Sequence, residues 1–290
     1  GTTFVNLYEN FLDGKLPRVG YIEMVKWVIA KEENELILNL VLGQMNNIYW
    51  SYLTEAERAS IAPDLERTLY FLMETKSEKP SVKKVFFNAF RNVTITDNNT
   101  GRLYDIWNGA KVEGLNLSEN DKVGLASQLA IRLPERADAI LKQQLDSIKN
   151  PDTKRRFEFV MPALSNSQQV RDAFFESLKD AKNRETESWV LSALGALHHP
   201  LRKESSEKYI LPSLELLKEI QETGDIFFPT RWTDQTLGNY NSASAVKIVR
   251  DFLKDNPDYN AQLKMKILQA ADNLFRSERI LGGKQSLQQK

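Results

Sequence analysis

Apolar residues recur at helical spacing along most of the chain. Ile22, Val25, Val28 and Ile29 lie three or four positions apart, which places them on one face of a helix. The segment 36–53 is apolar on most sides, so we expect a central helix that its neighbours cover. Later segments repeat the helical pattern: 82–90, 118–133, 137–148, 243–253 and 259–279. These patterns predict a chain built from helices.

Capping residues and prolines mark where several of these helices begin. Thr54 followed by Glu57 is a capping-box pattern, in which each residue's side chain bonds the other's backbone N–H. Asn150 stands directly before Pro151, and proline suits the first turn of a helix. The one β-branched run, residues 93–96, is short, and we expect a helix end and a loop there.

The number and pairing of the helices predict the fold class. We expect about fourteen or fifteen helices in pairs of about 30 to 45 residues, which is typical of an α-solenoid. The fold class is therefore all-α, a superhelical array of antiparallel helix pairs of the HEAT or armadillo kind. We expect residues 1–281 to form one helical domain. Residues 282–290 are polar with two glycines, and we expect a disordered tail.

Composition narrows the classes of partner and chemistry. The 290 residues include 39 Lys plus Arg and 39 Asp plus Glu. The chain therefore has no net positive charge that would attract nucleic acid. Cysteine is absent from the sequence, which excludes disulfides and thiol catalysis. No run of about 18 apolar residues predicts a membrane span. We expect a soluble protein without a nucleic-acid or membrane partner, and the compartment stays open between cytoplasm and periplasm.

The two histidines, His198 and His199, are the first candidates for metal or general-base chemistry. Adjacent residues on a helix point about 100° apart, so they do not converge on one metal as histidines four residues apart do. We expect both to lie at a helix end before Pro200, where imidazoles can bond the last carbonyls. The sequence therefore predicts no catalytic, metal or cofactor residue in this chain.

Other catalytic signatures are also missing. The sequence contains no H-E-x-x-H, G-x-S-x-G, G-x-G-x-x-G or P-loop pattern. Acidic clusters such as Glu32 with Glu33, or Glu185 with Glu187, are typical of solvated helix ends and faces. A self-sufficient hydrolase built on such carboxylates is the weakest of three functional hypotheses.

The five tryptophans have two kinds of expected role. Four lie within apolar helical patterns, where packing is expected: Trp27, Trp50, Trp107 and Trp189. Trp232 follows the sequence TGDIFFPTR, which predicts an irregular turn, and it is either a buried anchor or a peptide contact. From local sequence alone, the candidate peptide-binding residues are Arg184, Arg231, Trp232 and Tyr240, with arginine suited to a carboxylate.

Five segments in order resemble a known family: NLYENFLDG (6–14), ENELILNLVLGQMNNIYWSYL (33–53), ETESWVLSALGALHHPLR (185–202), LELLKEIQETGDIFFPTRW (214–232) and LQAADNLFR (268–276). Together they are similar to the C-terminal helical domain of bacterial aminopeptidase-N-like zinc metallopeptidases. The family's zinc-binding H-E-x-x-H, with its downstream Glu, and its G-A-M-E-N-type segment belong to an upstream domain and do not occur here. The resemblance implies a HEAT-like domain that closes a chamber over that catalytic domain.

The main hypothesis follows from this resemblance. The chain would be a non-catalytic domain of a zinc-dependent aminopeptidase, with peptide substrates and the upstream catalytic domain as partners and zinc bound only upstream. Gly1 stands where an initiator Met is expected, so we expect an excised segment of a longer protein. The alternative is an independent α-solenoid scaffold that binds a protein partner.

Overall fold

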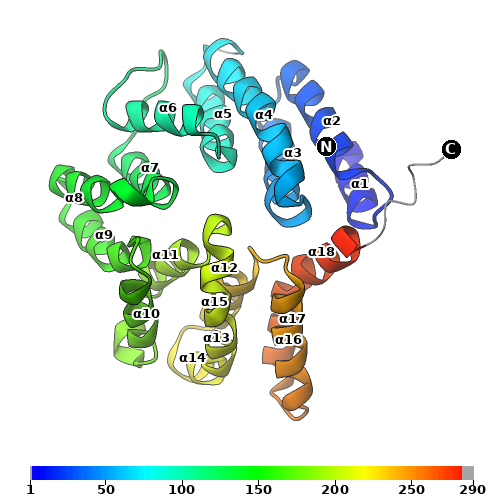
Figure 1. Cartoon of the computed structure of the whole chain (residues 1–290), viewed down its shortest axis with the longest axis vertical. Coiled ribbons are helices and arrows are strands. Elements are labelled where there is room, and N and C mark those ends of the chain that lie inside the picture. The colour runs from blue at the N-terminus through cyan, green and yellow to red at the C-terminus, as the bar shows by residue number, and fades with distance from the viewer. Residues whose placement is uncertain (1, 77, 283–290) are drawn as a thin grey trace. The chain divides into compact units, whose positions relative to one another are not determined.

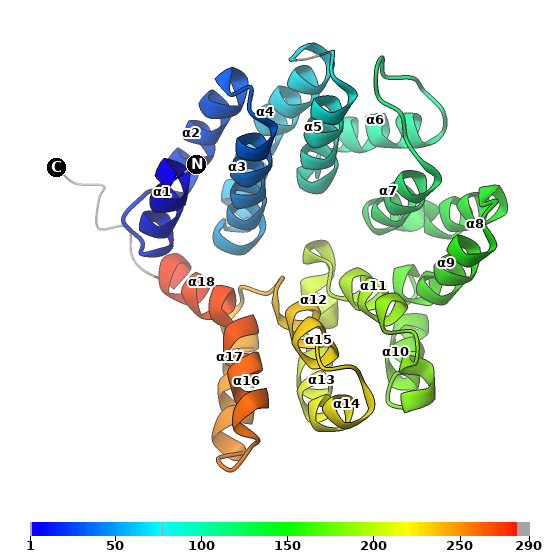
Figure 2. The ribbon, with the colours of Figure 1, turned by 180° about the vertical axis from the view of Figure 1, so that it is seen from behind.

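The computed structural model describes residues 2–76 and 78–282, and these residues form helices, turns and loops without a strand (Figures 1 and 2). The predicted all-α class is confirmed, whereas the solenoid arrangement stays a prediction. The chain divides into two compact units: unit 1, Gly1–Leu125 with Arg279–Lys290, and unit 2, Ala126–Glu278. The segment predicted as one domain thus contains two units of packing. The predicted tail, apart from Gly282, lies outside the described residues.

Unit 1 is built on helices that pack against their sequence neighbours. Its elements are α1 (Thr2–Leu12), α2 (Arg18–Lys31), α3 (Glu35–Asn47), a π-helical turn (Ile48–Tyr52), α4 (Glu55–Thr75), α5 (Pro80–Val93), α6 (Asp97–Trp107) and the first half of α7 (Glu119–Arg132). The α5 helix packs against both α3 and α4, and α2 packs against α3 and α4. The π-helical turn that continues α3 is buried, so the segment 36–53 is covered as predicted, although its first residue, Leu36, is 81% exposed.

Unit 2 has more and shorter helices. Its elements are the end of α7, α8 (Ala137–Ser147), α9 (Pro151–Leu164), α10 (Gln168–Ser177), α11 (Glu187–Leu197), α12 (Lys203–Ser206), α13 (Ile210–Glu215), α14 (Leu217–Thr223), α15 (Phe228–Leu237), α16 (Ala243–Asp255), α17 (Ala261–Ala270) and α18 (Asp272–Gly282) as far as Glu278. The α11 helix packs against α9 and α15, and α15 also packs against α17 and α13.

Helix starts follow the predicted capping chemistry. The Thr54 side chain accepts from the Glu57 N–H, and the Glu57 carboxylate accepts from the Thr54 N–H at 2.9 Å, which completes the capping box. The Asn150 side chain accepts from the two N–H groups that follow Pro151. The α5 helix ends at Val93, and residues 94–96 form a connection rather than a strand, as predicted. Local sequence therefore sets these boundaries.

One helix start is capped from a distant part of the chain. Glu66 of α4 is fully buried, and its carboxylate accepts from the Ile95 N–H at 2.7 Å and the Thr96 N–H at 3.2 Å. The same carboxylate accepts from the Thr96 hydroxyl at 2.5 Å and the Asn99 amide at 2.9 Å. Thr96, the N-cap residue of α6, provides no side-chain cap of its own. Glu66 thus accepts from the two N–H groups that directly precede α6 and ties this helix start to α4.

The tryptophans do not all pack as expected. Trp50 and Trp107 are buried and Trp189 is half-buried, which confirms the packing role. For Trp27 the packing prediction is wrong, because its ring is 62% exposed and carries the Lys31 ammonium 4.1 Å from the ring centre. An apolar residue in a helical pattern can lie at the edge of the buried face, and the pattern alone does not separate the edge from the centre.

Candidate peptide-binding site

The segment that we expected to be an irregular turn, residues 223–232, becomes helical at its end. The α14 helix ends at Thr223, and α15 begins at Phe228 with Pro229 in its first turn. The Asp225 carboxylate accepts from the Phe228 N–H at 2.9 Å, which restarts the helix after a short connection. A Cβ on Gly224 would lie 2.6 Å from Phe228 Cδ1, so the turn requires glycine there. The prediction of an irregular segment is therefore wrong beyond Phe227.

Trp232 and Tyr240 are core residues. Trp232 is fully buried on α15, and its indole N–H donates to the Ser213 carbonyl at 3.2 Å. Its ring packs edge-on against Phe228, with ring centres 5.9 Å apart. The Tyr240 ring is 1% exposed, and its hydroxyl lies 2.6 Å from His198 Nδ1. Of the two roles open for Trp232, the structure selects the buried anchor, and the expected peptide contact is corrected for both residues.

Arg184 is also unavailable to a ligand. Its guanidinium donates to the Leu178 carbonyl at 2.5 Å and the Lys179 carbonyl at 3.0 Å, just beyond the end of α10. It also pairs with the Glu219 carboxylate of α14 at 2.5 Å, and its side chain is 2% exposed. Arg184 therefore joins two helices, and a carboxylate ligand would have to compete with these bonds.

Arg231 is the one exposed residue of the four sequence candidates. Its guanidinium lies 5.9 Å from the ring centre of Phe227, which is 62% exposed, and the adjacent Ile226 is 80% exposed. An exposed cation beside exposed apolar side chains is a surface that a peptide can contact. The peptide-binding prediction therefore stays a prediction for Arg231, with Ile226 and Phe227 as its neighbours.

The histidines lie at a helix end as predicted, but with different partners. His198 is the C-cap residue of α11 and is fully buried, and its Nδ1 meets the Tyr240 hydroxyl rather than a carbonyl. His199 Nδ1 accepts from the Leu201 N–H at 3.2 Å, so His199 Nε2 carries the proton and donates to the Gln128 side-chain oxygen at 3.1 Å.

Burial controls the charge state of both histidines. Removal from water lowers the pKa of His198 to about 3. Burial, with smaller contributions from the positive charges of Arg132 and Arg202, lowers the pKa of His199 well below its ordinary value. Both imidazoles are neutral near pH 7. Within the described ranges, no group of three or more His, Cys, Asp or Glu side chains is placed to hold a metal ion.

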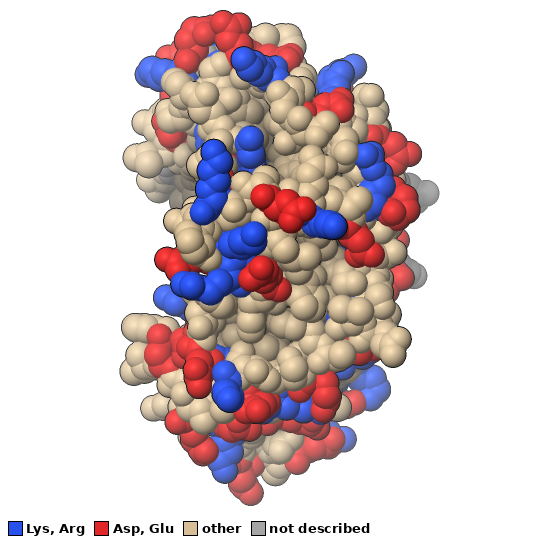
Figure 3. Space-filling view, turned by 90° about the vertical axis from the view of Figure 1, so that its left-hand side faces the viewer, with Lys and Arg blue, Asp and Glu red and all other residues tan. Residues whose placement is uncertain are grey.

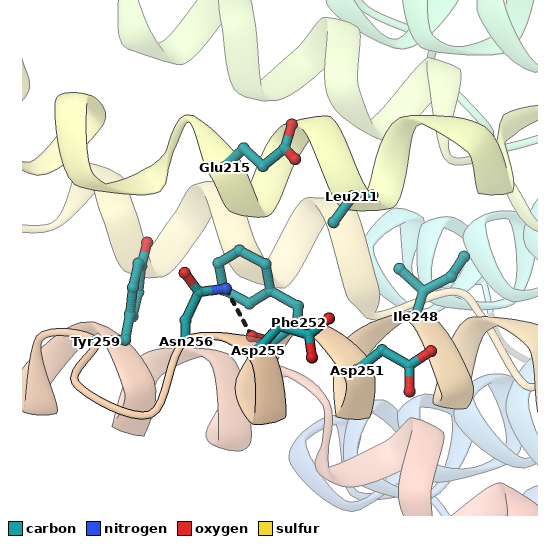
Figure 4. Close-up of a pocket in the computed structure, with 8 residues that line it drawn as sticks. All are labelled: Leu211, Glu215, Ile248, Asp251, Phe252, Asp255, Asn256 and Tyr259. Atoms are coloured by element: carbon teal, nitrogen blue, oxygen red, sulfur yellow. Dashed lines mark hydrogen bonds between the residues drawn. The ribbon is translucent and has the colours of Figure 1, made fainter.

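A pocket of about 550 Å³ lies within unit 2, between α13 and α16 (Figure 4). We call it the α13–α16 groove, and its lining residues are Leu211, Glu215, Ile248, Asp251, Phe252, Asp255, Asn256 and Tyr259. Its volume falls in the range of small-ligand and side-chain sites. Leu211 faces α16, and Phe252 and Ile248 rise toward α13 from the opposite side, with Tyr259 at one end. The groove therefore has a mixed lining, with open apolar surface from Leu211 and Ile248 beside polar side chains.

The polar groups of the α13–α16 groove are hydrogen-bond acceptors. Glu215, Asp251 and Asp255 supply three carboxylates, and no Lys or Arg lines the groove. Asp251 pairs with the exposed Lys247, whereas the Glu215 and Asp255 carboxylates make no ion pair or hydrogen bond with the described residues. The Asn256 amide nitrogen donates to the Phe252 carbonyl, so its side-chain oxygen remains an acceptor. Charge and hydrogen bonding both favour a cationic donor in this groove.

Sequence reasoning missed this groove because its two walls come from separate segments. The pattern 243–253 correctly indicated a helix with Phe252 on its apolar face. Asp251 and Asp255 are four residues apart and share one side of that helix, which is a visible signal of a charged edge. The sequence does not indicate that α13 lies opposite, since this pairing joins segments about 40 residues apart.

Charge elsewhere is mixed. On the face shown in Figure 3, acidic and basic side chains are interspersed, as the balanced composition predicts. None of the described helices is long and apolar enough to cross a membrane.

No known family model matches the chain, and no curated protein sequence matches it.

Proposed function

We propose that this chain is the non-catalytic C-terminal helical domain of a zinc-dependent aminopeptidase, which removes amino-terminal residues from peptides. The observation that carries the proposal is the occurrence, in order, of five segments that resemble this family's helical domain, from residues 6–14 to residues 268–276. The all-α fold is compatible with that domain. In this proposal the chain closes the active-site chamber and contacts the far part of the peptide, while the zinc belongs to an upstream domain.

Arg231 is the residue through which we propose peptide contact. Its side chain is exposed at the start of α15, next to the exposed Phe227 and Ile226. A guanidinium can pair with a peptide carboxylate, and the two apolar side chains can cover the peptide's last side chain. Binding energy gained far from the scissile bond can position the substrate for the reaction.

The proposal assigns no chemistry to the chain itself, which gives a direct test. The purified chain, incubated with Zn²⁺ and an aminoacyl reporter substrate, should release no product above the level without protein. Hydrolysis that increases with protein concentration and disappears with a chelator would overturn the proposal.

A second candidate is an independent scaffold that binds a protein partner. The observation in its favour is the set of large apolar side chains that lie at the surface of each unit, such as Trp27 and Phe71 in unit 1 and Ile226 in unit 2. A scaffold would be encoded as a self-contained reading frame, whereas the aminopeptidase domain requires a catalytic domain upstream.

A further inference from the structure

We infer that the α13–α16 groove binds a peptide segment that carries Arg or Lys beside apolar residues. The inference is independent of the proposed function, because the groove lies wholly within unit 2 and needs no other domain. None of the four residues that we expected to bind peptide lines this groove.

The acceptors of the groove define the charged part of the ligand. The Lys247 ammonium pairs with Asp251 and is also attracted to Asp255, so one cation is shared by two of the three carboxylates. Glu215 makes no ion pair with the described residues, and the groove keeps a net negative charge. The carbonyl end of α16, at Asp255, adds partial negative charge at the same place. Asn256 offers one more side-chain acceptor. A guanidinium or ammonium group, which has only donors, matches this set, and an anion is repelled by it.

The interior of the groove defines the rest of the ligand. Leu211 is 43% exposed, and with Ile248 it leaves apolar surface open to a ligand. The half-buried Tyr259 ring supplies a face for the stem or head of a cationic side chain, whereas the Phe252 ring is buried. The volume of about 550 Å³ exceeds the need of one Arg side chain and leaves room for an apolar neighbour. These features favour a peptide segment over a free polyamine, which lacks apolar branches.

Isothermal titration calorimetry on the purified chain tests the inference with two peptides. The first has the sequence Leu-Arg-Phe-Arg-Leu and the second has Leu-Glu-Phe-Glu-Leu, both acetylated and amidated so that their ends are neutral. The Arg peptide should bind with a Kd on the order of 100 μM and should bind more weakly at high salt. The Glu peptide should not bind at millimolar concentration. Equal binding of both peptides, or no binding of the Arg peptide at 1 mM, would overturn the inference.

Substitutions in the groove test whether the Arg peptide binds there. Glu215→Gln and Asp255→Asn should each raise the Kd about threefold, and the double variant roughly tenfold. Leu211→Arg places a tethered guanidinium in the groove and should abolish binding. Because Leu211 and both carboxylates are exposed, circular dichroism should show folded protein in each case. The matched control is Glu204→Gln, an exposed carboxylate on α12 outside the groove, which should leave the Kd unchanged.

Two outcomes contradict the assignment even if the Arg peptide binds. If Glu204→Gln weakens binding as much as Glu215→Gln does, the attraction is general and not local to the groove. If spermidine displaces the Arg peptide at equal concentration, the open apolar surface contributes nothing, and the peptide assignment fails. Neither outcome affects the proposed function, which depends on an upstream catalytic domain and not on this groove.

Discussion

Acidification from pH 7 to pH 5 should destabilise the chain through His198. The imidazole is fully buried, bonded to the Tyr240 hydroxyl, and its pKa of about 3 lies far below the ordinary value of 6.5. Between these two values the unfolded chain binds more protons than the folded chain, so stability rises with pH across this window. The destabilisation is absent above the ordinary pKa and grows as the pH falls toward 3.

The magnitude follows from the two pKa values. Integration of the difference in bound protons between pH 7 and pH 5 gives a loss of about 2 kcal/mol from His198 alone. His199 adds a loss of the same sign, because its pKa is also lowered by burial. Asp172 acts separately, since the Lys208 and Tyr209 side chains lower its pKa to about 2 and its stabilisation is lost only below about pH 4.

Urea unfolding at pH 7 and pH 5, followed by circular dichroism, measures this effect. The wild-type chain should lose about 2 kcal/mol more between the two pH values than His198→Gln, which has no titrating ring at this position. The test compares the loss of unfolding free energy from pH 7 to pH 5 in the two proteins. Their stabilities at pH 7 are not compared, because the substitution can also change stability there. If His198→Gln and the wild type lose equal stability on acidification, His198 is not a buried neutral imidazole, and the reasoning fails.

Two further predictions concern a buried cap and an exposed arginine. Glu66→Ala should lower the free energy of unfolding by about 3 kcal/mol, because the buried Asn99 amide and the half-buried N–H groups of Ile95 and Thr96 lose their acceptor. Glu74→Ala, at an exposed site on the same helix, should cost less than about 0.5 kcal/mol in the same urea titration. If the proposed function is correct, Arg231→Ala in the full-length aminopeptidase should raise KM for peptides with a free carboxy terminus more than for a small aminoacyl reporter. Equal changes in KM would contradict a carboxylate contact, and equal losses for the two glutamates would contradict the capping role.

Local sequence was sufficient where a structure depends on neighbours in the chain. The capping box at Thr54 and the proline start at Pro151 were predicted because cap and helix are within three residues of each other. The loop after Val93 was predicted for the same reason. The spacing of apolar residues at three and four positions likewise predicted an all-α chain, because each helix buries one face.

Sequence reasoning failed where a residue's role depends on a distant segment. Arg184 was predicted to be a ligand-binding residue, but the Glu219 carboxylate, 35 positions away, and two local carbonyls occupy its guanidinium. The burial of Trp232 depends on α13, where the Ser213 carbonyl accepts from its indole N–H, and local sequence does not indicate this contact. The α13–α16 groove went unpredicted because its carboxylates come from two helices that only the tertiary fold brings together.

The sequence of the natural gene on the amino-terminal side of Gly1 tests the central claim most directly. If the chain is the helical domain of an aminopeptidase, the reading frame continues upstream and encodes an H-E-x-x-H motif with a downstream glutamate. A reading frame that opens near Gly1 would contradict the aminopeptidase proposal and would favour the independent scaffold.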